Sequence, residues 1–177
     1  GSTCRAMANM GIKNLRIVGK KADYDEEKVK ILAIHAFSIW ENAVFFDSIE
    51  EATKDCYVSA GTTRRRGKKR KEWLLTPDEF STKVNDIETG KVAIIFGNER
   101  TGLTDEELEC CTLGVKIPTD EEFGSLNLSH AVQIICYELY KHLKVPTLTG
   151  YTPITLERLS KTVTSLTDDL KKVGFFS

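Results

Sequence analysis

The sequence predicts a single α/β domain in which a parallel sheet carries helices on its faces. Helix-like and strand-like segments alternate along the chain with short connections, which favours this class over separate helical and sheet regions. The run KVAIIF at 91–96 is apolar almost throughout, as expected for a strand in the centre of a parallel sheet. The 177 residues, 41% of them hydrophobic, are enough for one such domain with its own core.

The first predicted helix runs to Met10. Ser2 or Thr3 is its expected N-cap, and Gly11 is placed to end it, because glycine readily adopts the left-handed conformation that follows many helices. An α/β fold normally supplies a strand before such a helix. We therefore expect a strand upstream of Gly1 that this sequence does not contain.

Strands and helices then alternate up to residue 60. Apolar spacing predicts a helix over 25–37, with one face formed by Val29, Leu32, Ala33 and Ala36. The other expected elements are strands at 15–18, 43–46 and 56–60, and a helix capped by Asp47 or Ser48.

Two capping boxes mark helix starts in the second half of the chain. Thr76 with Glu79 and Thr104 with Glu107 have the required spacing, and Pro77 occupies a first helical position. The remaining expected elements are a strand at 114–117, a helix at 128–143, a linker at 145–153, and a helix at 155–172 that aligns Leu156, Leu159, Val163, Leu166 and Leu170.

Composition argues against several classes of protein. The chain has 25 Lys and Arg against 26 Asp and Glu, so any basic surface must be local. No apolar run approaches the roughly 20 residues that cross a bilayer, and no signal peptide opens the chain. The five cysteines are odd in number, and Cys110 and Cys111 lack the second pair that a zinc site needs. We expect a cytoplasmic protein with reduced thiols, no metal and no membrane segment.

The loop FGNERTGL at 96–103 follows the predicted strand at 91–96. Open α/β sheets usually bind ligands at the carboxyl ends of their strands, and Gly97 permits a close backbone approach to a ligand. The loop is neither a GxGxxG dinucleotide fingerprint nor a P-loop. Glu99 and Arg100 would orient other side chains there; a structural turn with a solvated ion pair is the alternative.

The segment GSLNLSH at 124–130 leads into a predicted helix. Free N–H groups at a helix start attract oxygen atoms and carboxylates. Ordinary capping by Ser125 or Asn127 is the structural alternative. We interpret His130 as a surface residue of the helix rather than a catalytic one.

The densest charge in the sequence is seven basic residues in the eight positions 64–71. Such a run can neutralise several phosphates and give affinity for nucleic acid without reading its sequence. A nuclear-localisation signal or a merely solvated loop would have the same composition. The side chains expected to contact nucleic-acid phosphates are Arg65, Arg66, Lys68, Lys69, Arg70 and Lys71.

Taken in order, these segments resemble the three motifs of the SpoU (TrmH-type) branch of the SPOUT RNA methyltransferases. GSTCRAMANMGI matches the first motif from its glycine onward and places the family arginine at Arg5, although the Asn that precedes this glycine in the family is absent here. Residues 92–103 match the second motif with Glu99 as its acidic residue, and 115–137 match the third, which contains SLN. The match covers nearly the whole chain and is most similar to the TrmJ-like subgroup, whose members methylate a ribose in the tRNA anticodon loop.

The resemblance implies a SPOUT-type parallel sheet with helices on both faces and a deep C-terminal trefoil knot, a rare exception to chain topology. This methyltransferase domain would span 1–146, and a linker and C-terminal helix would span 147–177. The resemblance also implies an S-adenosylmethionine site in the knotted loops, without a metal. By position, the expected cofactor contacts are Thr62, Thr63, Arg64, Gly97, Ile117, Gly124, Ser125 and Leu126.

The implied reaction is methyl transfer to a ribose 2′-hydroxyl. The resemblance assigns the central role to Arg5, which would orient the hydroxyl or an adjacent phosphate and stabilise the developing alkoxide. A guanidinium does not ordinarily act as a base, so general-base action by Arg5 is not assumed. Glu99, Ser125 and Asn127 would hold Arg5 and the surrounding loops in register.

Family members act as homodimers whose active site forms where two knotted regions meet. Val132, Ile135 and Leu139 are expected either at such an interface or buried within one chain. Two alternatives share the fold: an rRNA 2′-O-methyltransferase, and a non-catalytic RNA-binding module that kept the knot. A protein whose basic run is only a localisation signal would bind no cofactor.

Overall fold

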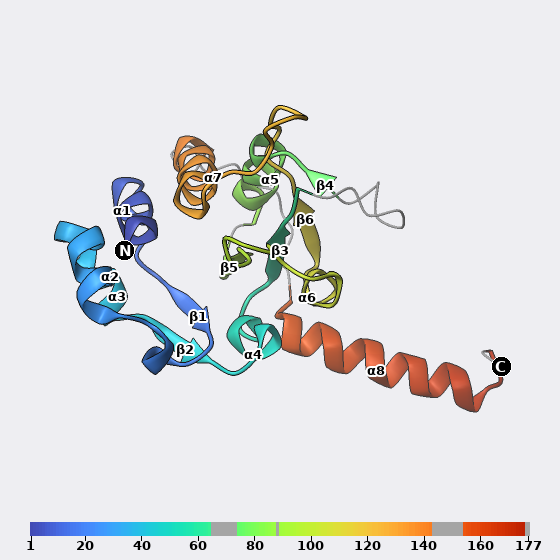
Figure 1. The fold of residues 1–177 in the computed structure, drawn as a ribbon. Helices are drawn as coiled ribbons and strands as arrows, with labels where there is room; N and C mark the ends of the chain where they lie inside the picture. Colours follow the sequence, from blue (N-terminus) through green and yellow to red (C-terminus); the bar gives the residue numbers. More distant parts are fainter. Residues whose placement is uncertain (65–73, 88, 143–153, 176–177) are drawn as a thin grey trace.

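The computed structural model describes residues 1–64, 74–87, 89–142 and 154–175, and it has the predicted α/β class with parallel strands and flanking helices (Figure 1). The strands are β1 (Arg16–Val18), β2 (Val44–Phe46), β3 (Val58–Thr62), β4 (Leu74–Leu75), β5 (Val92–Ile95) and β6 (Leu113–Val115). The helices are α1 (Ser2–Asn9), α2 (Glu26–Ala33), α3 (Phe37–Glu41), α4 (Ile49–Thr53), α5 (Pro77–Asn85), α6 (Asp105–Glu109), α7 (Leu128–His142) and α8 (Leu156–Lys172), with 3-10 turns η1 (Lys21–Asp23) and η2 (Ile34–Ala36).

The described strands form a parallel pair, β1–β2, and a parallel four-stranded sheet in the order β4–β6–β3–β5. Ala60 of β3 pairs with Ile94 of β5 on one side and with Leu113 of β6 on the other. Strand β5 therefore lies at the edge of this sheet, and the prediction that 91–96 is central is wrong. The interior strand β3 contains the small residues 59–61, which are buried. These residues do not form an apolar run, so hydrophobicity alone does not mark β3 as an interior strand. Hydrophobicity predicted a strand at β5 but did not fix its place in the sheet.

Side-chain caps begin the helices of the sheet region as predicted. Thr76 and Thr104 form the two expected capping boxes. At α4 the cap is Ser48 rather than Asp47, because the Ser48 hydroxyl accepts a hydrogen bond from the Glu51 backbone N–H at 3.1 Å. Each cap satisfies an N–H group that has no partner inside its helix.

Helix α1 departs from the predicted cap. Gly1 is its N-cap and makes no side-chain hydrogen bond, so the expectation that Ser2 or Thr3 caps this helix is wrong. Gly11, just beyond the helix, has a φ of 70°, as its predicted role in ending the helix requires.

The helix predicted over 25–37 is interrupted. Asp25 caps α2, which ends at Ala33, and a 3-10 turn then leads into α3. Ile34 has a φ of 51°, a left-handed value that a β-branched residue rarely adopts. Leu32, assigned to the apolar face, is 52% exposed, so that part of the prediction is wrong.

Helix α7 lies between two hydrophobic clusters. Val132 and Cys136 pack with α1, α2 and α3, whereas Ile135 and Leu139 pack with α5 and the four-stranded sheet. Val132, Ile135 and Leu139 are at most 6% exposed, so this face is buried within the chain rather than left for a partner. Burial also raises the pKa of the Cys136 thiol to about 11, and all five cysteines are free thiols.

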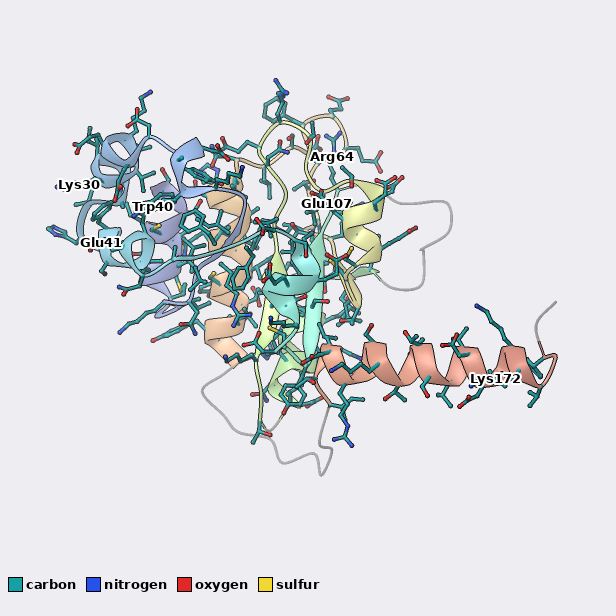
Figure 2. All side chains as sticks on the ribbon, turned by 90° about the horizontal axis from the view of Figure 1, so that it is seen from below. Lys30, Trp40, Glu41, Arg64, Glu107 and Lys172 are labelled. Atoms are coloured by element: carbon teal, nitrogen blue, oxygen red, sulfur yellow. The ribbon has the colours of Figure 1, made fainter. Side chains whose placement is uncertain are left out.

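Helix α8 extends away from the sheet (Figures 1 and 2). Thr155 caps it, and its first N–H, from Leu156, donates to the carbonyl of Cys56 at 2.7 Å. Its apolar side is largely exposed, since Val163 and Leu166 are 53% and 57% exposed. The predicted linker at 145–153 lies outside the described residues. In the part of the chain that the structure describes, no helix combines the length and the apolar character needed to cross a bilayer.

A network of charges joins β1 to the four-stranded sheet. The Arg16 guanidinium donates to both carboxylate oxygens of Asp55, at 2.5 and 2.8 Å, and Lys91 donates to the same carboxylate at 2.7 Å. Arg16 also donates to the carbonyl of Ala52 at 2.6 Å. Hydrogen bonds from Arg16, followed by those from Lys91, hold the pKa of Asp55 well below its ordinary value.

We expect Asp55→Asn to lower the free energy of unfolding at pH 7 by about 1 kcal/mol, because the half-exposed carboxylate is screened by solvent. A depressed pKa contributes stability above the unfolded value of about 4 that is lost as the pH falls toward the folded value. The difference between wild type and variant should therefore narrow as the pH falls from about 5 to 2. Urea unfolding across this range measures it. Asp168→Asn on exposed α8 is the control, and an equal loss there would contradict the assigned role.

Candidate active site

A cavity of about 230 Å³ lies at the carboxyl ends of β3, β5 and β6, where the loops after these strands meet. Three chain segments and the first turn of α7 form its walls. They contribute Thr62, Thr63 and Arg64; Phe96 to Leu103; Val115, Ile117 and Thr119; and Gly124, Ser125, Leu126, Leu128 and Ala131. The position agrees with the general tendency of parallel sheets to bind ligands beyond their carboxyl ends.

The structure brings all the predicted cofactor-binding residues to this one cavity. The residues are Thr62, Thr63, Arg64, Gly97, Ile117, Gly124, Ser125 and Leu126. Hydrogen bonds fix the end of β3 within this wall: the Thr62 hydroxyl donates to the Ile95 carbonyl at 3.0 Å, and the Thr63 N–H donates to the Val115 carbonyl at 3.0 Å. Residues separated by more than sixty positions thus line one space.

The loop after β5 is held by its own hydrogen bonds. The Asn98 side-chain oxygen accepts from the N–H groups of Arg100 and Thr101 at 3.0 and 2.9 Å. The Asn98 amide also donates to the Thr101 hydroxyl at 2.7 Å, and the Gly102 N–H donates to the Asn98 carbonyl at 3.0 Å. The sequence motifs assign Asn98 no role; the tendency of Asn side chains to bond nearby backbone in turns is the signal that indicates one. Exposed Glu99 and Arg100 both line the cavity.

Gly97 allows two backbone segments to lie against each other. A Cβ at this position would overlap with the backbone of Gly102 and Leu103. The loop therefore folds back on itself at the cavity wall in a way that only glycine permits.

Asn127 caps the first turn of α7. Its side-chain oxygen accepts from the N–H of Ser129 at 2.9 Å and from the Ser129 hydroxyl at 2.7 Å. Asn127 lines neither this cavity nor a second hollow described below. The contacts of Asn127 are those of an ordinary helix cap, and its role in holding Arg5 and the loops in register stays a prediction.

Arg5 lies at a second, more open hollow between α1 and α7. Its lining is mostly polar: Ser2, Arg5, Ala6, Asn9, Ser129, His130 and Gln133. The first turns of α7 separate the two spaces, since Leu128 and Ala131 line the first cavity whereas Ser129, His130 and Gln133 line the hollow. Among the described residues, Arg5 bonds to neither Glu99 nor Asn127. One chain therefore places Glu99 and Ser125 at one space and Arg5 at another.

The predicted RNA contacts Arg65, Arg66, Lys68, Lys69, Arg70 and Lys71 lie outside the described residues. Arg64, the first of the basic run, is described and lines the cavity. Figure 2 shows Arg64 among the loops beyond the sheet. The basic run thus begins at the rim of the cavity.

A family model described as the SpoU rRNA Methylase family matches residues 1–137. The chain belongs to the SpoU rRNA methylase family. This SpoU-family chain is 41% identical over 142 residues to the tRNA (cytidine-2'-O-)-methyltransferase TrmJ of Methanocaldococcus jannaschii, an alignment that covers 79% of this chain and 61% of that protein. The chain spans 54% to 61% of the length of the curated relatives it matches.

Solved structures of similar proteins share the fold of this SpoU-family chain. A probable methylase family protein from Haemophilus influenzae Rd KW20 matches with a TM-score of 0.76 and 33% identity, covering 99% of this chain and 75% of that one. TrmJ from Z. mobilis ZM4 matches with a TM-score of 0.82 and 29% identity, again covering 99% and 75%.

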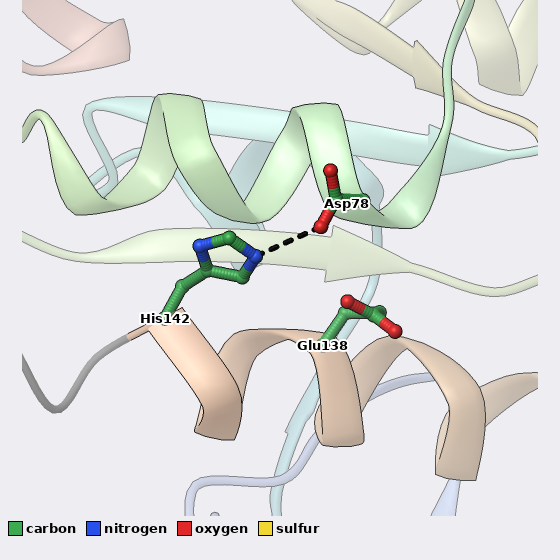
Figure 3. A group of neighbouring side chains, drawn as sticks. All are labelled: Asp78, Glu138 and His142. Atoms are coloured by element: carbon green, nitrogen blue, oxygen red, sulfur yellow. Dashed lines mark hydrogen bonds and ion pairs between the residues drawn. The ribbon is translucent and has the colours of Figure 1, made fainter.

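A cluster of titratable side chains joins α5 to α7 in this SpoU-family fold (Figure 3). His142 Nε2 lies 2.9 Å from Asp78 Oδ1. One carboxylate oxygen of Asp78, one of Glu138 and a ring nitrogen of His142 all lie within 4.8 Å of one another. Lys141 donates to Glu138 at 2.8 Å and its Nζ lies 4.0 Å from Asp78. Because Lys141 already supplies positive charge there, we interpret the cluster as an ion-pair network between two helices.

Proposed function

We propose that this chain transfers a methyl group from S-adenosylmethionine to a ribose 2′-hydroxyl of tRNA. The observation that carries the proposal is the single cavity at the carboxyl ends of β3, β5 and β6, which is lined by residues of the second and third methyltransferase motifs. The relatives named TrmJ support this reading, since their names specify 2′-O-methylation of tRNA.

The residues present fit the cofactor. Gly97 and Gly124 lie in the cavity wall where an added Cβ would collide with neighbouring chain, so glycine allows the loops that form this wall to pack closely. Ile117 and Leu126 supply apolar walls, and loop N–H groups can bind the adenine edge and the amino-acid portion. When bound, S-adenosylmethionine supplies a methyl group activated by its positively charged sulfur.

The deep trefoil knot is part of the proposal. Strand β6 inserts between β3 and β4, which both precede it in the chain. The segment from β6 to α7 also meets the residues that follow β3 and β5, because residues 63–64, 96–103 and 124–126 all contribute to one cavity. The methyltransferase domain would span 1–146, and the linker and C-terminal helix would span 147–177.

The chain's own residues would align and stabilise the reacting oxygen. S-adenosylmethionine, held by the residues that line the cavity, would supply the methyl group, and the 2′-hydroxyl would give up its proton to solvent as its oxygen accepts that group. Alignment of the attacking oxygen with the breaking bond supplies much of the rate. Arg5 would donate hydrogen bonds to the hydroxyl or adjacent phosphate and stabilise charge on the oxygen. Glu99, Ser125 and Asn127 would hold the loops that bound the site.

A homodimer would complete this site. Arg5 lines the open hollow, whereas Glu99 and Ser125 line the cavity on the other side of the first turns of α7. A second copy that sets its Arg5 opposite the cavity would unite the catalytic groups. Two-fold symmetry would create two such sites from one kind of contact. The proposed setting is the cytoplasm.

The chain could also act on rRNA. The family model is described by rRNA methylation, which favours this as the second candidate. We place tRNA first because curated relatives about 40% identical are named for tRNA, and we propose the anticodon loop as the target region. A non-catalytic RNA-binding module is the third reading.

Calorimetry with S-adenosylmethionine, followed by incubation with unmodified tRNA or rRNA and mapping of methylated riboses, tests the proposal. We expect one cofactor bound per chain and methylation of a ribose in the tRNA anticodon loop. Methylation of rRNA alone would favour the second candidate. RNA binding without cofactor binding would overturn methyl transfer and favour the third.

A further inference from the structure

Phe123, in the loop between β6 and α7, is the most exposed large apolar side chain among the described residues, at 87%. Exposure of an aromatic ring to water is unfavourable, and burial against a ligand would remove that cost. Figure 1 shows that this loop projects beyond the end of the sheet. The ring therefore stands outside the core, and the residues that follow it in the chain, Gly124 and Ser125, line the proposed cofactor cavity.

Hydrogen bonds give the loop a defined shape. The Asp120 carboxylate accepts from the N–H groups of Glu122 and Phe123 at 2.9 and 3.3 Å. The Thr119 hydroxyl donates to the Gly124 carbonyl at 3.2 Å. Gly124 is buried, and an added Cβ would lie 2.8 Å from the Asp120 carbonyl oxygen. The residues on both sides of Phe123 are thus fixed, so its exposure is a property of the folded loop.

The surroundings of Phe123 relate it to the cavity. Thr119, Gly124 and Ser125 line the cavity, as do Arg64 and Arg100. The Arg64 side chain passes close to Gly124, since its Cδ would lie 3.4 Å from a Cβ added there. A guanidinium-lined rim and an exposed aromatic ring together are typical of sites for single-stranded nucleic acid.

The charges within the loop favour a base over the RNA backbone as the partner of the ring. Glu121 and Glu122 are exposed beside Phe123 and would repel phosphate. A base has no such charge, and every base offers a flat face to an aromatic ring. A target ribose that enters a cavity mouth also requires its nucleotide to leave its stacked neighbours, which creates a need for a new stacking partner.

We propose that Phe123 stacks on a base of the single-stranded RNA segment that carries the target ribose. The inference rests on the proposed function, and it gives a role to a residue within the third motif to which the family resemblance assigns none. The ring holds the substrate at the cavity mouth while the methyl donor occupies the cavity. Phe123 contributes to RNA binding, whereas the residues that line the cavity bind the cofactor.

Phe123→Ala tests this, with Phe123→Tyr as the conservative variant and Phe175→Ala, a 72% exposed phenylalanine beyond α8, as the control. We expect Phe123→Ala to raise the KM for tRNA, and the Kd for tRNA from fluorescence anisotropy, roughly tenfold. The KM for S-adenosylmethionine should be unchanged. Phe123→Tyr should bind tRNA like the wild type, and tRNA should quench the indole fluorescence that Phe123→Trp adds.

Unchanged tRNA binding by Phe123→Ala would overturn the inference, as would an equal loss in Phe175→Ala. A loss of dimer without a loss of tRNA affinity would instead assign the ring to a protein contact. If the proposed methyltransferase function is wrong, the wild type will bind no cofactor and methylate no RNA, which is a different result from a loss of tRNA binding in Phe123→Ala. The anisotropy measurement does not depend on turnover, so it tests the ring in either case.

Discussion

Arg5→Ala should lower the rate of ribose methylation by at least about a hundredfold, the loss typical of removing one donor to a developing oxyanion. Arg5 is exposed on α1 and lines the hollow, so its truncation leaves the buried core and the cofactor cavity unchanged. Thermal unfolding and S-adenosylmethionine affinity should therefore match the wild type. Single-turnover methylation of tRNA measures the effect. Arg158→Ala, an exposed arginine on α8, is the control.

Mixing variants tests whether the proposed site needs two copies of the chain. A second variant, Gly97→Ala, whose expected cofactor affinity is about a hundredfold lower, is mixed with Arg5→Ala under conditions that exchange subunits, at a cofactor concentration that fills only the unaltered cavity. If Arg5 of one copy acts at the cavity of the other, each hybrid dimer contains one intact site, and random pairing restores about a quarter of wild-type activity. A mixture as inactive as its components, despite exchange, would contradict the shared site. Full activity of the Arg5→Ala variant alone would show that Arg5 has no catalytic role.

The sequence predicted local features of this fold well. Thr76 and Thr104 begin helices through the expected capping boxes because the bonds involved span only three residues. It failed where distant segments decide the outcome: β5 was predicted to be central but lies at the edge of the described four-stranded sheet. Strand order depends on how the chain returns to the sheet, and local hydrophobicity does not record that.

The sequence also predicted some features of the candidate site and missed others. The motifs identified Gly97 and Ser125, and the fold places both at one cavity. The motifs did not show that Arg5 lies at a separate hollow, because that depends on which side of α7 each residue occupies. Nor did they indicate Phe123, since an isolated phenylalanine in a sequence is more often part of a core. Only the folded loop shows the exposure of that ring.

Gly97→Ala should weaken S-adenosylmethionine binding by about a hundredfold, equivalent to about 3 kcal/mol. A Cβ at residue 97 would overlap with the backbone of Gly102 and Leu103, and backbone cannot rotate away as a flexible side chain can. The loop would have to open, which would displace a wall of the cavity. Calorimetry measures the affinity, and circular dichroism checks that the fold remains.

Gly11→Ala is the matched control for Gly97→Ala: Gly11 has a φ of 70° but open space around its Cβ position. Strain there should cost about 1 kcal/mol of stability without changing cofactor affinity. Wild-type affinity in Gly97→Ala would show that the loop after β5 does not form the cofactor site, and an equal loss in Gly11→Ala would make the effect one of general stability.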